Sequence, residues 1–98
     1  MTINKTCNDA ELTYVIEGRL DTTTAPELEA DLKKSIDGVT SLVFDMKDLE
    51  YVSSAGLRVL LAAQKVMNRQ GSMVLRNVKS EVLEVLEVTG FTDILTIE

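Results

Sequence analysis

The sequence predicts an α/β fold whose sheet is mixed, with an antiparallel hairpin at the N-terminus followed by parallel strands. Two patterns carry this prediction. Short strand-like runs alternate along the chain with segments whose apolar residues recur at helical spacing. The first two runs are separated only by a tight turn, which favours antiparallel pairing. Because the chain has 98 residues, we expect one domain over residues 1–98.

The hairpin is predicted from two segments at the start of the chain. Residues 2–8 and 11–18 alternate side chains between two faces, which is typical of strands. Asn8 and Asp9 between them are turn formers. A connection this short leaves no room for a crossover, so the two strands should run antiparallel.

The first helix is expected to follow the hairpin. Thr24 and Glu27 stand three residues apart and fit a capping box, in which each side chain bonds the other's backbone N–H. Pro26 falls in the first turn, where its missing N–H costs nothing. Gly38 is expected to end the helix. The apolar face of the helix consists of Ala25, Leu28, Leu32 and Ile36.

The rest of the chain continues to alternate strands and helices. The expected elements are a buried strand at 40–46, a helix from Ser54 or Ala55 to Arg69, a buried strand at 72–76 and a helix at 80–89. Gly71 and Gly90 should end these helices, and Ser80 should cap the second of them. Residues 91–98 fit either a short strand or a helical turn.

This order of elements predicts where a functional site lies. The second and third strands are joined through a helix, so they should be parallel and their carboxyl ends should open on one edge of the sheet. The loops 18–24 and 47–54 then meet at that edge. In open α/β sheets, binding sites form outside the carboxyl ends of the strands.

Charge and composition exclude several functions. The net charge of −6 repels phosphate backbones and anionic lipid head groups, so we expect no direct nucleic-acid binding. No apolar stretch is long enough to enter and span a bilayer, and no signal-peptide pattern is present, which favours the cytoplasm. Cys7 is the only cysteine, in keeping with a reducing compartment.

The chain also lacks the residues of common active sites. With no histidine, it can build neither a Ser-His-Asp triad nor a zinc site of the usual kind, and no phosphate-binding glycine loop is present. Asp21, Asp45 and Asp48 fall near one edge, although turn and cap roles are more common for such aspartates. An enzyme that uses only carboxylates remains possible, but we expect no enzyme activity, no cofactor and no metal.

The segment Ser53-Ser54-Ala55-Gly56 permits two readings. A serine is a good N-cap for the helix that follows. Two serines are present, however, and Gly56 is a poor helix residue that would leave the first N–H groups uncovered. Such a helix start accommodates an anion, so a phosphate on Ser54 would be tolerated there and would change the surface that a partner contacts.

Three stretches together resemble the STAS domain, a family named for sulfate transporters and anti-sigma-factor antagonists. They are residues 20–28 (LDTTTAPEL), 48–61 (DLEYVSSAGLRVLL) and 89–97 (TGFTDILTI). The resemblance implies a sheet with helices packed mainly on one face. It also implies that a member of this size binds an anti-sigma factor that is itself an ATP-dependent serine kinase, and so releases a sigma factor. Phosphorylation would end this binding, and a phosphatase would restore it.

The resemblance also implies roles for single residues. Ser54 aligns with the acceptor serine and Asp21 with the acidic residue of the loop before the first helix. Ser53 stands where many phosphorylated members carry aspartate, and it is the alternative acceptor. A different reading is a STAS subunit or regulator of a lipid or anion transporter without a working phosphoserine. The predicted partner-binding edge consists of Asp21, Thr22, Thr23, Ser53, Ser54, Gly56, Leu57 and Arg58.

Overall fold

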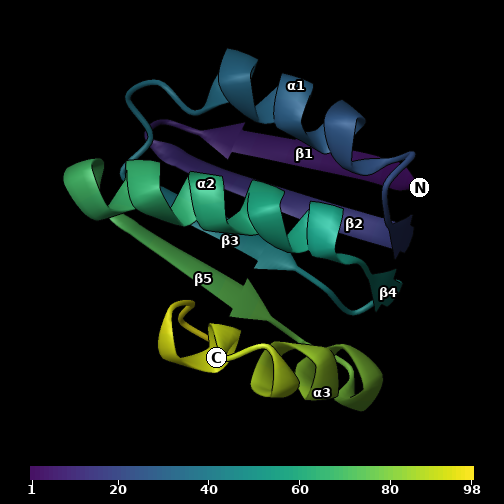
Figure 1. The fold of residues 1–98 in the computed structure, drawn as a ribbon. Helices are drawn as coiled ribbons and strands as arrows, with labels where there is room; N and C mark the ends of the chain where they lie inside the picture. The colour runs from purple at the N-terminus through teal and green to yellow at the C-terminus, as the bar shows by residue number, and fades with distance from the viewer.

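A computed structural model describes residues 1–98 (Figure 1). The elements in chain order are β1 (Thr2–Asn8), β2 (Glu11–Leu20), α1 (Ala25–Ser35), β3 (Ser41–Asp45), β4 (Leu49–Val52), α2 (Ser54–Gln70), β5 (Ser72–Arg76), α3 (Ser80–Val88) and the 3₁₀ helix η1 (Phe91–Asp93). The predicted alternation of strands and helices is confirmed, and one further strand, β4, lies where a loop was expected.

The sheet has the predicted mixed character. Its strands lie in the order β1-β2-β3-β5, with β1 antiparallel to β2 and the remaining neighbours parallel. The long strand β2 has two partners on one side. Residues 11–15 pair with β3, and residues 18–20 pair with β4, also in parallel, with a register shift between Gly18 and Arg19. β3 and β4 therefore run in the same direction and lie one after the other along the same side of β2.

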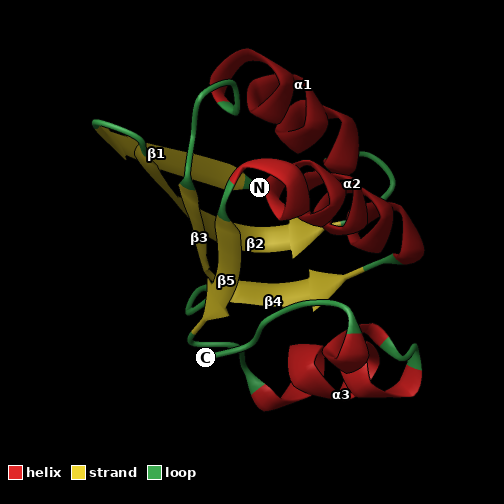
Figure 2. Ribbon diagram, turned by 90° about the vertical axis from the view of Figure 1, so that its left-hand side faces the viewer, coloured by secondary structure: helices red, strands yellow, loops and turns green.

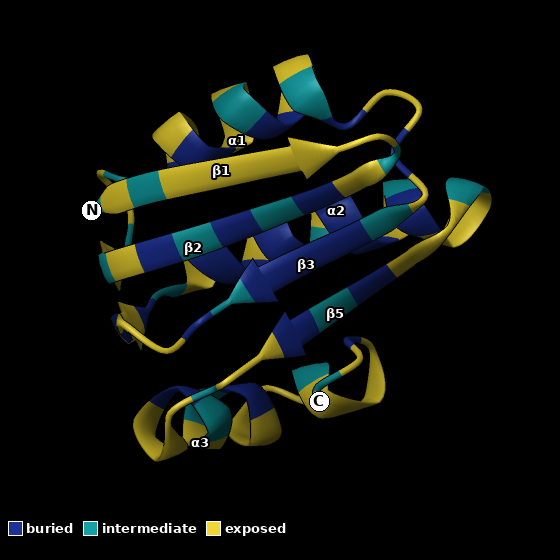
Figure 3. Ribbon diagram, turned by 180° about the vertical axis from the view of Figure 1, so that it is seen from behind, coloured by how far each residue is buried: buried dark blue, intermediate teal, exposed yellow.

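The helices divide between one face and one end of the sheet. Figure 2 shows α1 and α2 against the same face, with α3 beneath, where it packs against β4. Alternate residues of β2 (Leu12, Tyr14 and Ile16) point into the layer below the helices and are fully buried. Each such side chain contributes about 1.5–3 kcal/mol of transfer free energy. The opposite face of the sheet carries no helix (Figure 3).

A polar cluster fixes α1 to the sheet. The Tyr14 hydroxyl donates to Asp31 Oδ1 at 2.6 Å, and Lys5 Nζ lies 3.1 Å from the same oxygen. The Tyr14 hydrogen bond is the largest cause that lowers the pKa of Asp31, while burial raises the pKa of Tyr14. The cluster therefore holds a charged carboxylate between β1, β2 and α1.

Two predicted caps are wrong. Thr24 is the N-cap of α1, but its hydroxyl makes no capping bond, because it accepts from Asp21 N at 2.8 Å. The N-cap of α3 is Lys79 rather than Ser80, which is the first helical residue. The final segment contains both alternatives: η1 is a helical turn, and Ile97 then forms a parallel bridge with Leu75 of β5.

Candidate functional site

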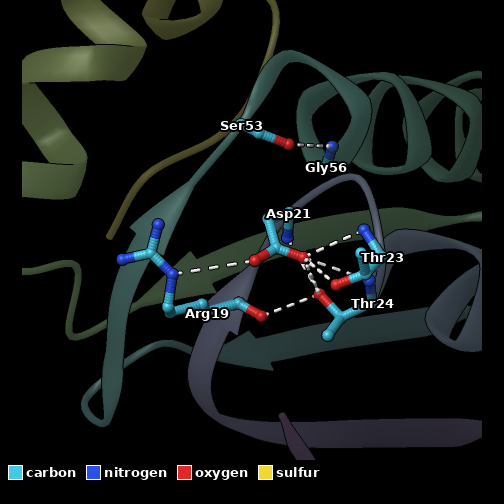
Figure 4. A network of polar contacts seen from close by, with 6 residues as sticks. All are labelled: Arg19, Asp21, Thr23, Thr24, Ser53 and Gly56. Atoms are coloured by element: carbon cyan, nitrogen blue, oxygen red, sulfur yellow. Dashed lines mark hydrogen bonds and ion pairs between the residues drawn. The ribbon is translucent and has the colours of Figure 1, made fainter.

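The ends of β2 and β4 lie side by side at one edge of the sheet. Leu20 and Val52 are paired residues, and the Ser53 N–H donates to the Leu20 carbonyl at 2.9 Å. The loop after β2 and the start of α2 therefore meet there, as the parallel arrangement predicts (Figure 4). The strand that meets β2 at this edge is β4, which the sequence did not reveal.

On the β2 side, Asp21 organises the loop into α1. Its Oδ1 atom accepts hydrogen bonds from Thr23 N at 3.0 Å, Thr23 Oγ1 at 2.8 Å and Thr24 N at 3.2 Å. The Thr23 hydroxyl is the largest cause that lowers the pKa of Asp21; desolvation opposes it, and the Thr23 and Thr24 N–H groups add to it. Asp21 is thus a charged hydrogen-bond acceptor that shapes the loop. Because its carboxyl group is deprotonated, it is unsuited to act as a general acid.

On the β4 side, the two serines have different roles. Ser53 is the N-cap of α2, and its hydroxyl accepts from Gly56 N at 3.3 Å. Ser54 is the first residue of the helix, is exposed, and has no hydrogen-bond partner for its hydroxyl within the chain. The capping reading therefore applies to Ser53, and it leaves the Ser54 hydroxyl accessible.

The structure gives a different reason for a glycine at position 56 from the one that the sequence predicts. Its N–H is bonded to Ser53, so the glycine does not leave that group uncovered. A Cβ atom on Gly56 would lie 2.7 Å from Leu20 Cγ, 2.9 Å from the Leu20 carbonyl oxygen and 3.0 Å from Val52 Cγ2. The residue is a glycine because the first turn of α2 packs directly on the ends of β2 and β4.

Burial removes two residues from the predicted binding edge. Gly56 is buried, and Leu57 is only 4% exposed. Both belong to the contact between α2 and the sheet, so a partner cannot reach either residue. The accessible remainder, called here the switch edge, consists of Asp21, Thr22, Thr23, Ser53, Ser54 and Arg58.

A shallow hollow separates the starts of α1 and α2 within this edge. Its volume is about 180 Å³, and Thr22, Pro26, Ala55 and Arg58 are among the residues that line it. The lining brings together Thr22 and Arg58, two residues predicted from separate loops. Arg58 is exposed and has no ion pair within the chain.

Two further residues at this edge were missed by sequence reasoning. Arg19 of β2 pairs with Tyr51 of β4, and its Cζ atom lies 4.2 Å from the centre of the Tyr51 ring. Arg19 Nε lies 3.6 Å from Asp21 Oδ2. The only signal for this pair is the register between β2 and β4, which follows from the unpredicted strand.

The other aspartates do not form an acid site with Asp21. Asp45 Oδ1 accepts from Lys47 N in the turn after β3 and from Asn77 Nδ2 in the turn after β5, each at 3.1 Å. Asp48 is exposed, and its carbonyl accepts from Gly18 N. The chain contains no cluster of acidic or cysteine side chains able to hold a metal ion, and none of its helices is both long and apolar enough to cross a membrane.

The sequence of this chain is similar to those of several known proteins. The sequence profile of the STAS domain matches residues 2–98. BtrV of Bordetella bronchiseptica, provisionally named as an anti-sigma factor antagonist, is 40% identical over 91 residues, which cover 91% of this chain and 78% of BtrV. The anti-sigma-B factor antagonist of Bacillus subtilis is 30% identical over 91 residues, covering 92% and 84% of the two chains.

A solved structure confirms the fold. The anti-sigma factor antagonist SpoIIAA, in its unphosphorylated form, superposes with a TM-score of 0.80. The two sequences are 16% identical, and the match covers 99% of this chain and 87% of SpoIIAA. The predicted arrangement, a mixed sheet with helices mainly on one face, is confirmed.

Proposed function

The chain belongs to the STAS domain family, and from this premise we propose that it is an anti-sigma-factor antagonist. It binds an anti-sigma factor in the cytoplasm and so releases a sigma factor, and it is not itself an enzyme. Relatives at 40% and 30% identity carry the name anti-sigma factor antagonist, which supports the proposal. The binding surface is the switch edge, and the partner is a serine kinase whose action on Ser54 ends the binding.

The accessibility of Ser54 is the observation that carries this proposal. It is the first residue of a 17-residue helix, its hydroxyl is unbonded, and Ser53 has already capped the helix. In the kinase reaction, Ser54 Oγ bonds to the γ-phosphorus of ATP, the bond from that phosphorus to ADP breaks, and the hydroxyl proton passes to a base of the kinase. The positive end of the α2 dipole favours the added phosphate, so the fold is preserved.

The phosphate acts at the interface rather than on the fold. It adds about −1.5 to −2 charges in the middle of the switch edge. Burying that charge against a partner costs desolvation free energy, and partner carboxylates are repelled. A phosphatase that removes the group restores the binding surface.

The test is a binding titration with the anti-sigma factor kinase from the same genome, followed by intact mass spectrometry after ATP is added. Wild type should bind, gain one phosphate and then lose affinity. Ser54→Ala should bind without gaining phosphate, and Ser54→Asp should bind more weakly than wild type. Ser80→Ala is the matched control, because Ser80 is also an exposed first residue of a helix.

Other results would redirect the proposal. A phosphate that persists in Ser54→Ala but is lost in Ser53→Ala would move the acceptor to Ser53. Equal affinity of wild type and Ser54→Asp would exclude a phosphoserine switch. Binding to a transporter subunit in place of the anti-sigma factor would establish the transporter-regulator reading.

A further inference from the structure

The Arg19–Tyr51 pair is a surface feature that the proposed function does not use. Tyr51 is 39% exposed, and it is one of three large hydrophobic residues that remain exposed in the chain. The Arg19 side chain is 60% exposed although it is stacked on the Tyr51 ring. Tyrosine and arginine are the residue types that most often dominate binding energy when they become buried in an interface.

The position of the pair connects it to the switch edge. Arg19 lies two residues before Asp21, and Tyr51 lies two residues before Ser53. Their neighbours Leu20 and Val52 are buried beneath the first turn of α2. Because side chains alternate along a strand, Arg19 and Tyr51 point to the opposite side, away from α2. The pair therefore extends the edge from the helix starts onto the open face of the sheet.

The guanidinium group is held in place before any partner arrives. One face of it lies on the Tyr51 ring, and its Nε atom lies 3.6 Å from Asp21 Oδ2. Asp21 is itself fixed through Oδ1 by Thr23 and Thr24. Figure 4 shows the two terminal nitrogens of Arg19 pointing away from Asp21. An ordered side chain of this kind loses less conformational entropy on binding than a free one does.

We infer that the Arg19–Tyr51 pair is a second contact for the anti-sigma factor, and that it receives a carboxylate side chain of that partner. The inference rests on the proposed function. The free edge of a guanidinium group matches a carboxylate with two parallel hydrogen bonds. Asp21 lies beside the Nε atom only, so the terminal nitrogens remain available as donors.

The experiment measures affinity for the anti-sigma factor at two salt concentrations, with the unphosphorylated full chain. Arg19→Glu should weaken binding by about tenfold or more, and Arg19→Lys by less, because lysine keeps the charge without the planar fork. Tyr51→Ala should weaken binding several-fold, whereas Tyr51→Phe keeps the stack and should bind as wild type does. The affinity of wild type should fall more steeply with salt than that of Arg19→Glu.

Arg69→Glu is the matched control. Arg69 is exposed in the last turn of α2, at the other end of that helix from the switch edge, and its reversal changes the net charge equally. It should leave affinity within about twofold of wild type. An equal loss in Arg19→Glu and Arg69→Glu, or no loss in Arg19→Glu, would overturn the inference while leaving the proposed function intact. Failure of wild type to bind would overturn both, and unfolding midpoints exclude loss of the fold as a cause.

Discussion

The starts of α1 and α2 face each other across one edge of the sheet, and both are rich in hydroxyl groups, yet their chemistry differs. At α1, Asp21 holds the hydroxyls of Thr23 and Thr24 in a closed set of hydrogen bonds. At α2, a single 3.3 Å bond from Gly56 N to Ser53 Oγ completes the cap, and the neighbouring Ser54 hydroxyl is unbonded. The number of hydroxyl groups therefore does not indicate which one is available for modification.

The difference follows from what each helix start packs against. The loop before α1 is exposed, so it needs a side chain that fixes its own backbone, and Asp21 does so. The first turn of α2 is fixed by contact of Gly56 with Leu20 and Val52. Because packing holds this turn in place, one serine suffices as a cap and the next is left to serve another purpose.

The largest expected effect comes from filling the space at Gly56. Gly56→Ala should destabilise the protein by about 1–3 kcal/mol, because the added Cβ atom collides with Leu20 and Val52. Helix propensity alone predicts the opposite sign, a gain of up to about 1 kcal/mol. Urea unfolding measures the difference, and Ala55→Ser serves as the control at the neighbouring half-buried position. A stabilised Gly56→Ala protein would show that packing does not fix this turn.

The next-largest effect is expected in an acid titration, in which the amides at the start of α1 should respond and the Gly56 amide at the start of α2 should not. The folded pKa of Asp21 is lowered, so its stabilising contribution is complete above the unfolded value of about 3.9 and is lost as the pH falls through the lower folded value. In NMR spectra, the Thr23 and Thr24 amides should titrate with a midpoint below about 3.9, whereas the Gly56 amide, which is bonded to a serine hydroxyl, should not follow that titration. Asp21→Asn should abolish the titration at both threonines. A midpoint at or above the unfolded value would contradict the closed hydrogen-bond set.

A smaller loss is expected when the cap of α2 is removed. Ser53→Ala should cost about 0.5–1 kcal/mol, at the lower end of the range for N-caps because the bond is long. Ser53→Asp keeps an acceptor at the N-cap and should unfold at nearly the wild-type urea concentration. A cost in Ser53→Asp equal to that in Ser53→Ala would mean that the side chain stabilises the protein by some means other than capping.

The smallest effect on stability is expected at Ser54. Ser54→Ala removes an exposed hydroxyl without a partner and should change the free energy of unfolding by less than about 0.5 kcal/mol. The same urea experiment measures it beside Ser53→Ala. If the two variants lost equal stability, the division between a capping serine and an accessible serine would be wrong.

Much of the fold could be predicted from local patterns in the sequence. The hairpin, the three helices and the strands at 41–45 and 72–76 each carry a clear periodicity or an apolar run. β4 carries none, because only its end residues Leu49 and Val52 are buried and the two between them are exposed. The Arg19–Tyr51 pair depends on that strand, so it also could not be predicted.

The errors at single residues arise where a residue outside the expected motif contacts it. Thr24 and Glu27 fit a capping box by spacing, but Asp21 engages the Thr24 hydroxyl first. Gly56 has the composition of an open helix start, but it is a point of close contact with β2. Asp21 stands only three residues before Thr24, so the first error lies within the local sequence. The contact of Gly56 with Leu20 depends on the tertiary fold, and no local pattern contains that information.

The bridge between Ile97 and Leu75 protects the chain from self-association through the edge of β5. Backbone bonds from Leu75 to Thr96 and from Glu98 to Leu75 occupy the outer side of β5, and an ion pair between Arg76 and Glu98 closes it further. A bare strand at that border would offer its peptide groups to any other chain. Removal of residues 96–98 would therefore expose the edge of β5 to pairing with another copy of the chain. The shortened chain should self-associate at a concentration at which the intact chain does not.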